Sequence, residues 1–518
     1  MNGAENLSTR VLRDIPRPAR EKLGTSGWSK GLFRLRGLLR GNLELSQMRY
    51  HYAMPTYAVE NFGCRAAQAD GAALEQQFAS RGLGRAPVAL ADVVVLNTCT
   101  VTNSADRDAR AAIRRVQRQN PAAKIIVTGC YAQRAPEEVA ALPGVAVVVG
   151  NSHKHQLAEI ALGEAGGFEQ FPSSQYFFPL GNLAGQRPAG DDRRLFVSDI
   201  FAHTELLAAP VFEATARTRP ILKVQDGCDN RCSFCVIPSV RGRSRSLPLG
   251  EVISQVRTLV NAGYRELVIS GINLGRWGRD LEHSTEHFIG LVRAILGRTE
   301  LEKLRISSVE PMDWSDDLIS LVAESPRIAK HAHVPMQSGS DAVLRRMHRK
   351  YRPWHYREKI EKIREAMPEA AIGADVMVGF PGETDAEFEC TRRMVEELPF
   401  TYLHVFTYSA RPGTPAALMG EQVPIGIARE RNKILRDLGA EKKQAFLSSL
   451  VGQTIEAITL GSYGADTLAR DGGIQQTFTE ALSDNYQKLI LKGSHAANQW
   501  LRIQIENVEN ETLIGSPL

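Results

Sequence analysis

Short apolar runs alternate with charged helical stretches along most of this chain, and the alternation constrains its fold more than any other feature. Between residues 54 and 162, it predicts strands at 57–62, 93–96, 125–128 and 145–149, with helical stretches between them. A repeated strand–helix–strand order is typical of a parallel sheet covered by helices. We therefore predict an α/β fold whose N-terminal domain, residues 54–162, is an open parallel sheet.

The same alternation resumes on a larger scale in residues 219–449, which we predict to form a central domain. Its expected strands are 221–225, 266–270, 304–308, 331–335, 374–378 and 402–406, and a charged helix is expected at 418–449. Six strand–helix units are too few for an eight-stranded barrel, so we predict an incomplete (β/α) barrel. Residues 450–518 turn to short alternating runs, which predict a small β-barrel of the kind that binds RNA.

The remaining segments lack a sustained period. Residues 1–53 carry ten Lys or Arg against four Asp or Glu and are predicted to be a disordered extension. A true start at Met54, a basic RNA-binding arm and a transit peptide remain open there. Residues 163–218, rich in Gly, Pro and Ser, are predicted to connect the two α/β domains. No apolar run is long enough to span a bilayer, so we expect a cytoplasmic protein without a membrane partner.

Three cysteines lie within eight residues, in Cys228-Asp-Asn-Arg-Cys232-Ser-Phe-Cys235, shortly after the first strand of the central domain. Seven cysteines in 518 residues are too few for a disulfide scaffold, which favours metal binding or catalysis. A structural zinc site needs four ligands, and no fourth Cys or His lies nearby. Three thiolates suit a [4Fe–4S] cubane whose remaining iron is open to a substrate. Three buried thiols without a metal are the alternative.

Cys64, Cys99 and Cys130 are far apart in sequence, but each directly follows a predicted strand of the N-terminal sheet. Because the carboxyl ends of parallel strands lie along one edge of a sheet, we expect these thiols to lie together. Gly63 and Gly129 would let the backbone approach a bulky cofactor. The three thiolates predict a second cubane with an open iron, and scattered buried cysteines are the alternative.

Several ordered motifs give the chain a family resemblance. They are Asn61-Phe-Gly-Cys64, Asn97-Thr-Cys-Thr-Val-Thr-Asn103, Val127-Thr-Gly-Cys-Tyr-Ala-Gln133, the Cys228–Cys235 segment and Gly379-Phe-Pro-Gly-Glu-Thr384. With them, the chain from Met54 onward resembles the methylthiotransferases, two-cluster radical S-adenosylmethionine (SAM) enzymes that replace a C–H bond by C–S–CH3. The second and third motifs most resemble the branch that modifies N6-threonylcarbamoyladenosine (t6A) at position 37 of tRNA. The C-terminal barrel resembles a TRAM domain.

The resemblance implies cofactors, partners and site residues. Cys228, Cys232 and Cys235 would hold the [4Fe–4S] cluster that cleaves SAM, and Cys64, Cys99 and Cys130 would hold a second one that carries the sulfur. The radical from SAM would abstract hydrogen from adenine C2, and the carbon radical would capture the sulfur. The tRNA anticodon loop, a reducing electron donor and a sulfur source would be the partners. The implied SAM contacts are Glu310, Gln337, Ser338, Arg349 and Asp375. Gly271, in a glycine-rich loop after the strand 266–270, could also admit part of SAM; an ordinary turn at Gly271 and helix caps at Glu310 and Asp375 are the alternatives.

Other functions stay open at this point. Within the family, the acceptor could be isopentenyladenosine in tRNA or an aspartate of a ribosomal protein. Outside the enzymes, the chain could be a non-catalytic iron–sulfur carrier or an RNA-binding scaffold. Reductive formation of 5′-deoxyadenosine from SAM would separate the enzyme from the carrier and the scaffold.

Ala67 departs from the family pattern, which usually has Asn three residues after the first cysteine. A methyl group cannot hydrogen-bond a cluster sulfur or its supporting loop, so we expect the surroundings of this cluster to differ. Asp70 does match an acidic position of the family. Cys390, left over from the two groups of three, lies on a predicted helix and is expected to be a small core hydrophobe.

Overall fold

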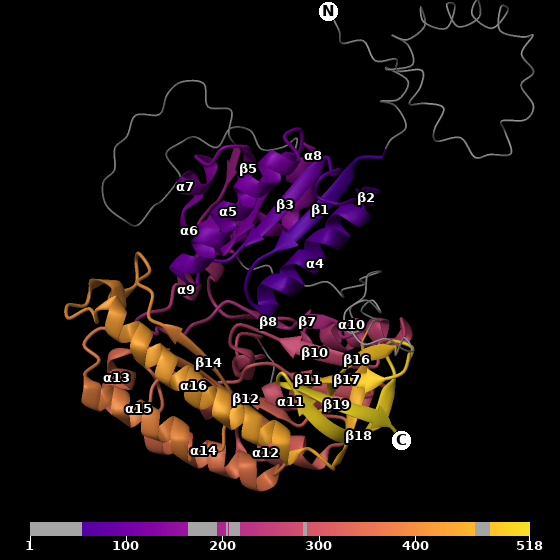
Figure 1. The fold of residues 1–518 in the computed structure, drawn as a ribbon. Coiled ribbons are helices and arrows are strands. Elements are labelled where there is room, and N and C mark those ends of the chain that lie inside the picture. The colour runs from indigo at the N-terminus through magenta and orange to yellow at the C-terminus, as the bar shows by residue number, and fades with distance from the viewer. Residues whose placement is uncertain (1–53, 164–193, 204–205, 207–217, 283–286, 461–476) are drawn as a thin grey trace, which may run out of the picture. The chain divides into compact units, whose positions relative to one another are not determined.

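The computed structural model describes residues 54–163, 194–203, 206, 218–282, 287–460 and 477–518. Within them, a parallel sheet region, a larger α/β region and a small β-barrel follow one another along the chain (Figure 1). The basic segment 1–53 and most of the predicted connection 163–218 lie outside the described residues. The order of these three regions is the order that the sequence predicts.

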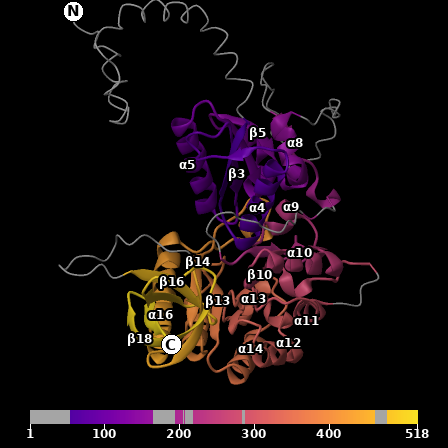
Figure 2. The same ribbon diagram turned by 90° about the vertical axis from the view of Figure 1, so that its right-hand side faces the viewer.

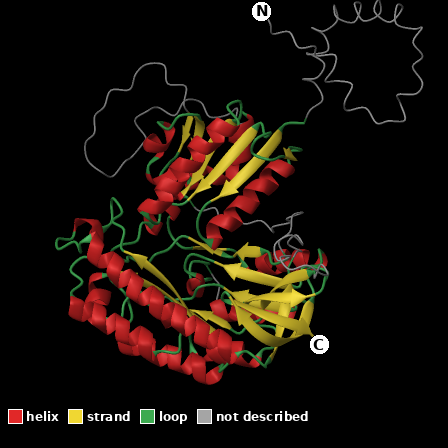
Figure 3. Cartoon of the chain, in the orientation of Figure 1, coloured by secondary structure: helices red, strands yellow, loops and turns green. Residues whose placement is uncertain are grey.

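The N-terminal region is a six-stranded sheet in which every neighbouring pair of strands is parallel (Figure 3). The strand order is β2-β1-β3-β4-β5-β6. The strands are β1 (Thr56–Asn61), β2 (Gly84–Arg85), β3 (Val93–Thr98), β4 (Lys124–Gly129), β5 (Val145–Val149) and β6 (Arg194–Phe196). β6 comes from the predicted connection, where the sequence shows no strand period, and it extends the edge of the sheet beside β5.

Helices cover both faces of this sheet. On one side lie α4 (Arg65–Ala79) and α8 (Leu157–Leu162), and on the other α5 (Asn103–Gln119), α6 (Cys130–Arg134) and α7 (Pro136–Ala140). Alternate residues of β3 pack on opposite sides: Val93 and Val95 contact the first pair of helices, and Val94 and Leu96 contact the other three. A strand buried on both faces is apolar throughout, which explains the continuous apolar run of β3.

The central region contains two three-stranded parallel sheets in the orders β11-β10-β7 and β12-β13-β14. Figure 2 labels β10 of the first sheet and β13 and β14 of the second. The strands are β7 (Ile221–Lys223), β10 (Glu266–Ser270), β11 (Lys303–Ile306), β12 (His331–His333), β13 (Ala371–Val378) and β14 (Tyr402–Thr407). The helices are α10 (Leu249–Asn261), α11 (Phe288–Arg298), α12 (Asp316–Glu324), α13 (Asp341–Arg346), α14 (Pro353–Ala366) and α15 (Asp385–Glu397). One hydrophobic core joins both sheets to these helices, and the incomplete (β/α) barrel is confirmed.

Two details of the sequence prediction are wrong. The helix expected from residue 418 is α16 (Ile425–Ser449), which begins later because Pro424 lacks an N–H group and disfavours helix in the residue before it. Cys390 is exposed, not a core residue. It lies beside the stripe of α15 that packs inward, which is formed by Phe388, Thr391, Met394 and Val395.

The C-terminal region is a closed five-stranded barrel in the order β15-β16-β17-β19-β18. Its strands are β15 (Thr454–Thr459), β16 (Phe478–Ser483), β17 (Lys488–Lys492), β18 (Trp500–Glu509) and β19 (Thr512–Pro517). Leu447 and Leu450, at the end of α16, pack into the core of this barrel. The predicted small β-barrel is therefore confirmed. Within the described ranges, no helix combines the length and apolar character that a membrane crossing requires.

Candidate active site

The segment Cys228–Cys235 forms a loop after strand β7. The chain passes from β7 through β8 (Gln225–Asp226) and the three cysteines into α9 (Ile237–Arg241). Gly227 turns the chain with a φ of +70°, and its missing side chain makes room for the carbonyl group of Arg243. All three cysteines of the loop are half-buried.

Nitrogen donors surround the sulfur atoms of this first triad. The side-chain amide of Asn273 donates to Sγ of Cys228 over 3.6 Å, and Nη1 of Arg349 donates to Sγ of Cys232 over 3.3 Å. Burial raises the pKa of Cys235 to about 12, so a thiolate there needs a metal or a positive charge to stabilise it. Three adjacent thiols with N–H donors around them fit an iron–sulfur cluster.

The second triad is assembled from three strands that are neighbours in the N-terminal sheet. Cys64, Cys99 and Cys130 follow the carboxyl ends of β1, β3 and β4. Thr98 pairs with Gly129 across β3 and β4, so Cys99 and Cys130, one residue further along each strand, lie level. Burial and then the charges of Cys130 and Cys64 raise the pKa of Cys99 to about 12.

Both glycines that precede these cysteines have positive φ angles, +108° at Gly63 and +99° at Gly129. A Cβ atom at Gly63 would lie 2.7 Å from Cβ of Cys99, and one at Gly129 would collide with the backbone of Thr98. We expected the two glycines to make room for a cofactor. Their missing side chains also let neighbouring strand ends approach each other, which brings the cysteines together.

Ala67, at the start of α4, receives support from the neighbouring strand. Nδ2 of Asn97 donates to the carbonyl oxygen of Ala67 over 2.7 Å and to Oδ1 of Asn61 over 3.0 Å. Oδ1 of Asn97 accepts from Lys154 over 3.2 Å. The first turn after Cys64 is therefore held by an amide from β3, although Ala67 itself cannot hydrogen-bond through its side chain.

No three His, Cys, Asp or Glu side chains in the described part of the chain converge closely enough to hold a single metal ion. A cubane does not need such convergence, because each thiolate binds a different iron at its own corner. The donor set of each triad, three thiols, therefore suits a cluster rather than a single ion.

Five buried charged side chains connect the regions that carry the two triads. Asp70 of α4 accepts from Lys154 over 3.0 Å, from Arg241 over 2.9 Å and from Lys223. Asp226 accepts from Lys223 over 2.8 Å and from Arg241 over 2.9 Å. Three cations thus face two carboxylates, and one positive charge remains uncompensated within this buried group.

The ionisation of the two aspartates depends on this network. Burial alone would raise the pKa of Asp70, but Lys154, Lys223 and Arg241 outweigh it and hold the pKa below its ordinary range. Burial likewise opposes ionisation of Asp226, and Arg241 and Lys223 again lower its pKa. Both carboxylates are therefore charged at neutral pH.

The two triads also meet through apolar contacts. Cys130 packs against Val236 and Val240, which follow Cys235 directly at the start and within α9. Asn151 donates to Sγ of Cys130 over 3.6 Å and to the carbonyl oxygen of Val240 over 2.7 Å. The second triad therefore packs on the helix that leaves the first one.

Of the predicted SAM contacts, Glu310 and Arg349 lie together beside the first triad. Arg349 forms an ion pair with Glu310 and also donates to Cys232. Gln337 has a φ of +62°, and its Oε1 is buried without a hydrogen-bond partner among the described residues. A strained residue with an unsatisfied buried acceptor is a candidate ligand contact.

The other predicted SAM contacts lie in different surroundings. Oδ1 of Asp375 is 3.4 Å from Nε2 of His333, on the neighbouring strand. Gly271 packs against β8, where a side chain would be crowded. The hydroxyl of Ser338 is 3.1 Å from Oγ1 of Thr391 on α15, and Ser338 is only 1% exposed. The side chain of Ser338 therefore points into the protein interior.

Sequence reasoning missed several residues of the site. Gln225 donates to the carbonyl oxygen of Gly227 over 2.8 Å and accepts from the backbone N–H of Asn273 over 2.7 Å. These bonds connect the loop that carries the first triad to the loop after β10. The pairing of Lys223 with Asp70 was missed as well. A signal was present, because a lysine inside the apolar run Ile221-Leu-Lys-Val requires a buried partner.

Ring side chains on β12 and β14 were also missed. Nε2 of His331 lies 2.7 Å from Oη of Tyr402. The ring centroid of His333 lies 6.0 Å from that of Tyr402 and 5.6 Å from that of His404. The signal was a spacing of two residues on each predicted strand, which places side chains on the same face.

Comparison with known proteins gives two family matches. Residues 56–150 match the model described as Uncharacterized protein family UPF0004, and residues 222–395 match that of the Radical SAM superfamily. Threonylcarbamoyladenosine tRNA methylthiotransferase MtaB of Bacillus subtilis (strain 168) is 37% identical, over 85% of this chain and 91% of its own length. A tRNA-2-methylthio-N(6)-dimethylallyladenosine synthase of Novosphingobium aromaticivorans is 35% identical, over 78% of this chain and 86% of its own.

Among solved structures, the radical SAM methyltransferase TsrM from Kitasatospora setae, with cobalamin and a [4Fe–4S] cluster bound, aligns with a TM-score of 0.49. It is 15% identical and covers 71% of this chain and 77% of its own. Membership of the Radical SAM superfamily implies a [4Fe–4S] cluster and SAM as cofactors. With both family matches in order and relatives that align over most of their length, this chain belongs to the radical SAM tRNA methylthiotransferases.

Proposed function

We propose that this enzyme converts t6A at position 37 of tRNA into its 2-methylthio derivative and uses two [4Fe–4S] clusters to do so. The observation that carries the two-cluster proposal is the meeting of Cys64, Cys99 and Cys130 at one sheet edge, apart from Cys228–Cys235. The name of the Bacillus subtilis relative supports t6A as the acceptor. We expect the enzyme to act in the cytoplasm, where its tRNA substrate is found.

The two triads take separate roles in this proposal. When bound, the cluster at Cys228, Cys232 and Cys235 supplies reductive cleavage of SAM, and the cluster at the other triad supplies the site that holds the sulfur. One open iron cannot hold SAM and a sulfur donor at the same time, which is why two sites are needed. A reducing electron donor and a sulfur source are therefore partners of the enzyme, together with the tRNA anticodon loop.

The residues around the first triad orient SAM. Arg349 is held by its ion pair with Glu310 and donates to Cys232, so these side chains fix one wall beside the cluster. The free Oε1 of Gln337 offers an acceptor for an ammonium or hydroxyl group of SAM. Asp375, paired with His333, and Gly271, on the loop after β10, complete the proposed contacts. Ser338 acts indirectly, by holding the Gln337 turn against α15.

The acceptor adenine must leave the anticodon stack to reach this site, because enzymes that modify a base in RNA act on an unstacked nucleotide. The C-terminal β-barrel has the architecture of small RNA-binding barrels and is proposed to position the anticodon loop. Isopentenyladenosine is the second candidate acceptor, and the name of the Novosphingobium relative favours it.

Mass spectrometry of tRNA nucleosides tests the proposal directly. A strain that lacks the gene should lose 2-methylthio-t6A and accumulate t6A, and restoring the gene should reverse both changes. Purified enzyme should also form 5′-deoxyadenosine from SAM under reducing conditions. If 2-methylthio-t6A persists in the deletion strain while 2-methylthio-isopentenyladenosine disappears, the t6A assignment is wrong and the second acceptor replaces it.

A further inference from the structure

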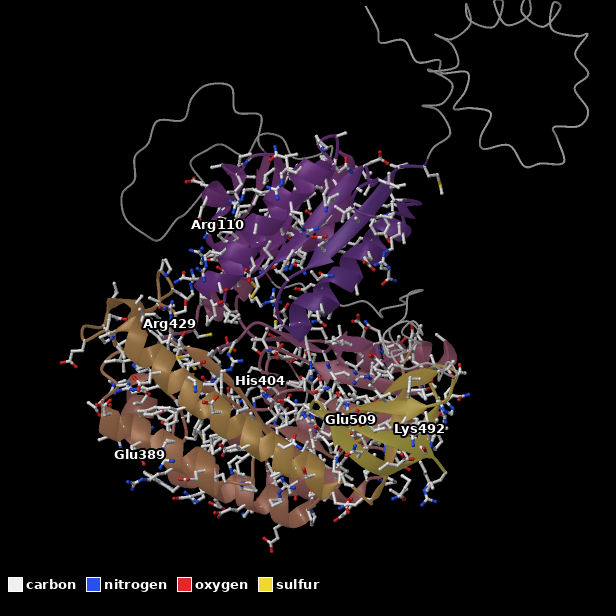
Figure 4. The ribbon with its side chains drawn as sticks, in the orientation of Figure 1. Arg110, Glu389, His404, Arg429, Lys492 and Glu509 are labelled. Atoms are coloured by element: carbon white, nitrogen blue, oxygen red, sulfur yellow. The ribbon has the colours of Figure 1, made fainter. Side chains whose placement is uncertain are left out.

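Four ring side chains line the face of β12, β13 and β14 that is turned away from the helices. His331 and His333 alternate on β12, and Tyr402 and His404 alternate on β14. Gly373 lies between them on β13 and pairs with both His333 and Tyr402, and a side chain at Gly373 would collide with the Tyr402 ring. We call these four rings the ring wall. His404, labelled in Figure 4, is exposed and His331 is buried, so the wall is open to solvent at its His404 end.

Tyr486, in the turn between β16 and β17, adds a fifth ring from the C-terminal barrel. Its centroid lies 4.9 Å from that of His331, and its φ of +69° is unusual for a bulky residue. Three guanidinium groups surround the Tyr486 ring. Their Cζ atoms lie 5.4 Å, 6.0 Å and 5.3 Å from its centroid, in Arg65, Arg219 and Arg305 respectively.

Arg65 differs from the other two arginines in its partners. Glu266 lies 2.6 Å from Nε of Arg305 and 3.5 Å from Nη1 of Arg219, so these two cations share one carboxylate. Arg65 instead donates to the hydroxyl of Tyr486 over 2.9 Å, and a phenol hydroxyl is a neutral partner. Within the described ranges, no carboxylate lies at ion-pair distance from Arg65. The half-buried guanidinium of Arg65 therefore has its positive charge and its remaining N–H groups available to bind an anion.

Arg65 is also next in the chain to a residue of the second triad. Arg65 directly follows Cys64, a proposed ligand of the sulfur-holding cluster. In t6A the threonine carboxylate hangs from N6, on the same ring as C2, the carbon that receives the sulfur. The Arg65 guanidinium contacts Tyr486, which packs against His331 of the ring wall, so Arg65 links the Cys64 end of β1 to that wall. A substituent on N6 would reach this guanidinium when the adenine lies on the wall with C2 facing the sulfur.

We infer that Arg65 binds the carboxylate of the threonylcarbamoyl group while the adenine ring stacks on the ring wall; this inference rests on the proposed function. A guanidinium matches a carboxylate through two parallel N–H···O bonds, and Tyr486 fixes its orientation. Histidine and tyrosine rings are the usual stacking surfaces for unstacked bases in RNA. The ring wall and Arg65 thus recognise the base and its substituent separately.

Selectivity follows from the same geometry. An isopentenyl group is apolar, so it would leave the Arg65 guanidinium desolvated without an anion. The site should therefore disfavour isopentenyladenosine as well as favour t6A, which makes Arg65 a specificity residue rather than a catalytic one. The cluster ligands and SAM contacts keep their roles when Arg65 is changed.

The test crosses two enzymes with two substrates. The enzymes are the wild-type full chain and its Arg65→Gln variant, both with their clusters loaded. The substrates are two anticodon stem-loops, one with t6A and one with the neutral carboxamide analogue of t6A. The wild type should prefer the carboxylate, and Arg65→Gln should lower kcat/KM roughly 10- to 100-fold on t6A alone, the range of a lost charge-assisted hydrogen bond. Stem-loop affinity, measured by fluorescence anisotropy, should weaken for the carboxylate substrate only.

Three further variants serve as controls. Arg65→Lys keeps the charge but loses the planar fork, so it should recover part of the t6A activity. Tyr486→Phe removes the hydroxyl that orients Arg65 and should cause a smaller loss. Arg114→Gln removes an exposed arginine of α5 and should change neither substrate. Iron content and 5′-deoxyadenosine formation without RNA should match the wild type in all four variants.

Two results would overturn the inference while the proposed function stands. One is an equal loss on carboxylate and carboxamide, which would make Arg65 a positioning residue of the Cys64 loop. The other is no loss on either substrate. A wild type that acts on an isopentenyladenosine stem-loop but not on t6A would instead overturn the proposed function, and this inference with it. The wild-type arm therefore separates the two failures.

Discussion

The two cysteine triads offer the same donor atoms through opposite structural means. Cys228, Cys232 and Cys235 lie in one loop, so the backbone of eight residues sets their separation. Cys64 and Cys99 belong to different strand ends, and only the pairing of β1 with β3 and of β3 with β4 brings the second triad together. Each triad has an asparagine amide 3.6 Å from one sulfur, Asn273 in the first and Asn151 in the second.

The two triads are therefore vulnerable to different changes. The first triad depends on local geometry, such as the positive φ of Gly227, and on donors from the barrel loops. The second depends on strand register, because a shift of one residue would turn the following side chain to the other face of the sheet. The buried network around Asp70 joins both regions, so a change in it should reach both sites.

The largest expected effect separates the roles of the triads. Cys232→Ala should abolish 5′-deoxyadenosine formation and methylthiolation together, because SAM cleavage is assigned to the first triad. Cys99→Ala should abolish methylthiolation while SAM cleavage continues. Each variant should lose about half of the iron, since each triad is proposed to hold one of two cubanes. Chromatography of 5′-deoxyadenosine, nucleoside mass spectrometry and iron analysis measure these outcomes, and loss of SAM cleavage in Cys99→Ala would contradict the division of labour.

The next effect concerns the buried network that joins the two regions. Arg241→Gln leaves Asp70 and Asp226 with fewer buried partners, and removing one partner of a buried pair costs about 3–5 kcal/mol. A denaturant titration should show this loss in the free energy of unfolding. Arg345→Gln breaks an exposed pair with Asp341 and should cost at most about 1 kcal/mol. Similar losses in both variants would show that the network adds nothing beyond a surface pair.

The pH dependence of stability follows from the same carboxylates. The folded pKa of Asp70 lies below its unfolded value of about 3.9, so its contribution is fully present above that pH and is lost as the pH falls toward the folded pKa. Asp226 acts in the same direction. The stability difference between wild type and Asp70→Asn should be constant near neutral pH and shrink below about pH 4. A difference that grows on acidification would contradict the sign.

The smallest effect compares the two asparagine donors. An N–H donor near a ligand sulfur stabilises the reduced, more negative form of a cluster, so its removal should lower the reduction potential. Asn273→Ala should lower only the potential of the first cluster, and Asn151→Ala only that of the second. Redox titration followed by electron paramagnetic resonance measures both. A shift of both potentials in one variant would show that the two clusters share their surroundings.

Much of the fold was predictable because its signals are local. The six central strands appear near the positions expected from apolar periodicity, and the first triad is recognisable from the spacing of three cysteines. The errors are also local in origin. Helix α16 begins at Ile425, after Pro424, rather than at the predicted residue 418. Cys390 lies one residue away from the buried stripe of α15, and on a helix this shift is enough to expose a side chain.

What the sequence determined by itself is therefore the set of elements and the contiguous cysteine loop, since both depend on contacts a few residues apart. The tertiary structure decided which distant residues meet. The placement of Cys99 beside Gly63, the pairing of Lys223 with Asp70 and the contact of Arg65 with Tyr486 depend on strand order and on domain packing. Strand order and domain packing depend in turn on the burial of whole faces of sheets and helices, which the spacing of neighbouring residues does not encode.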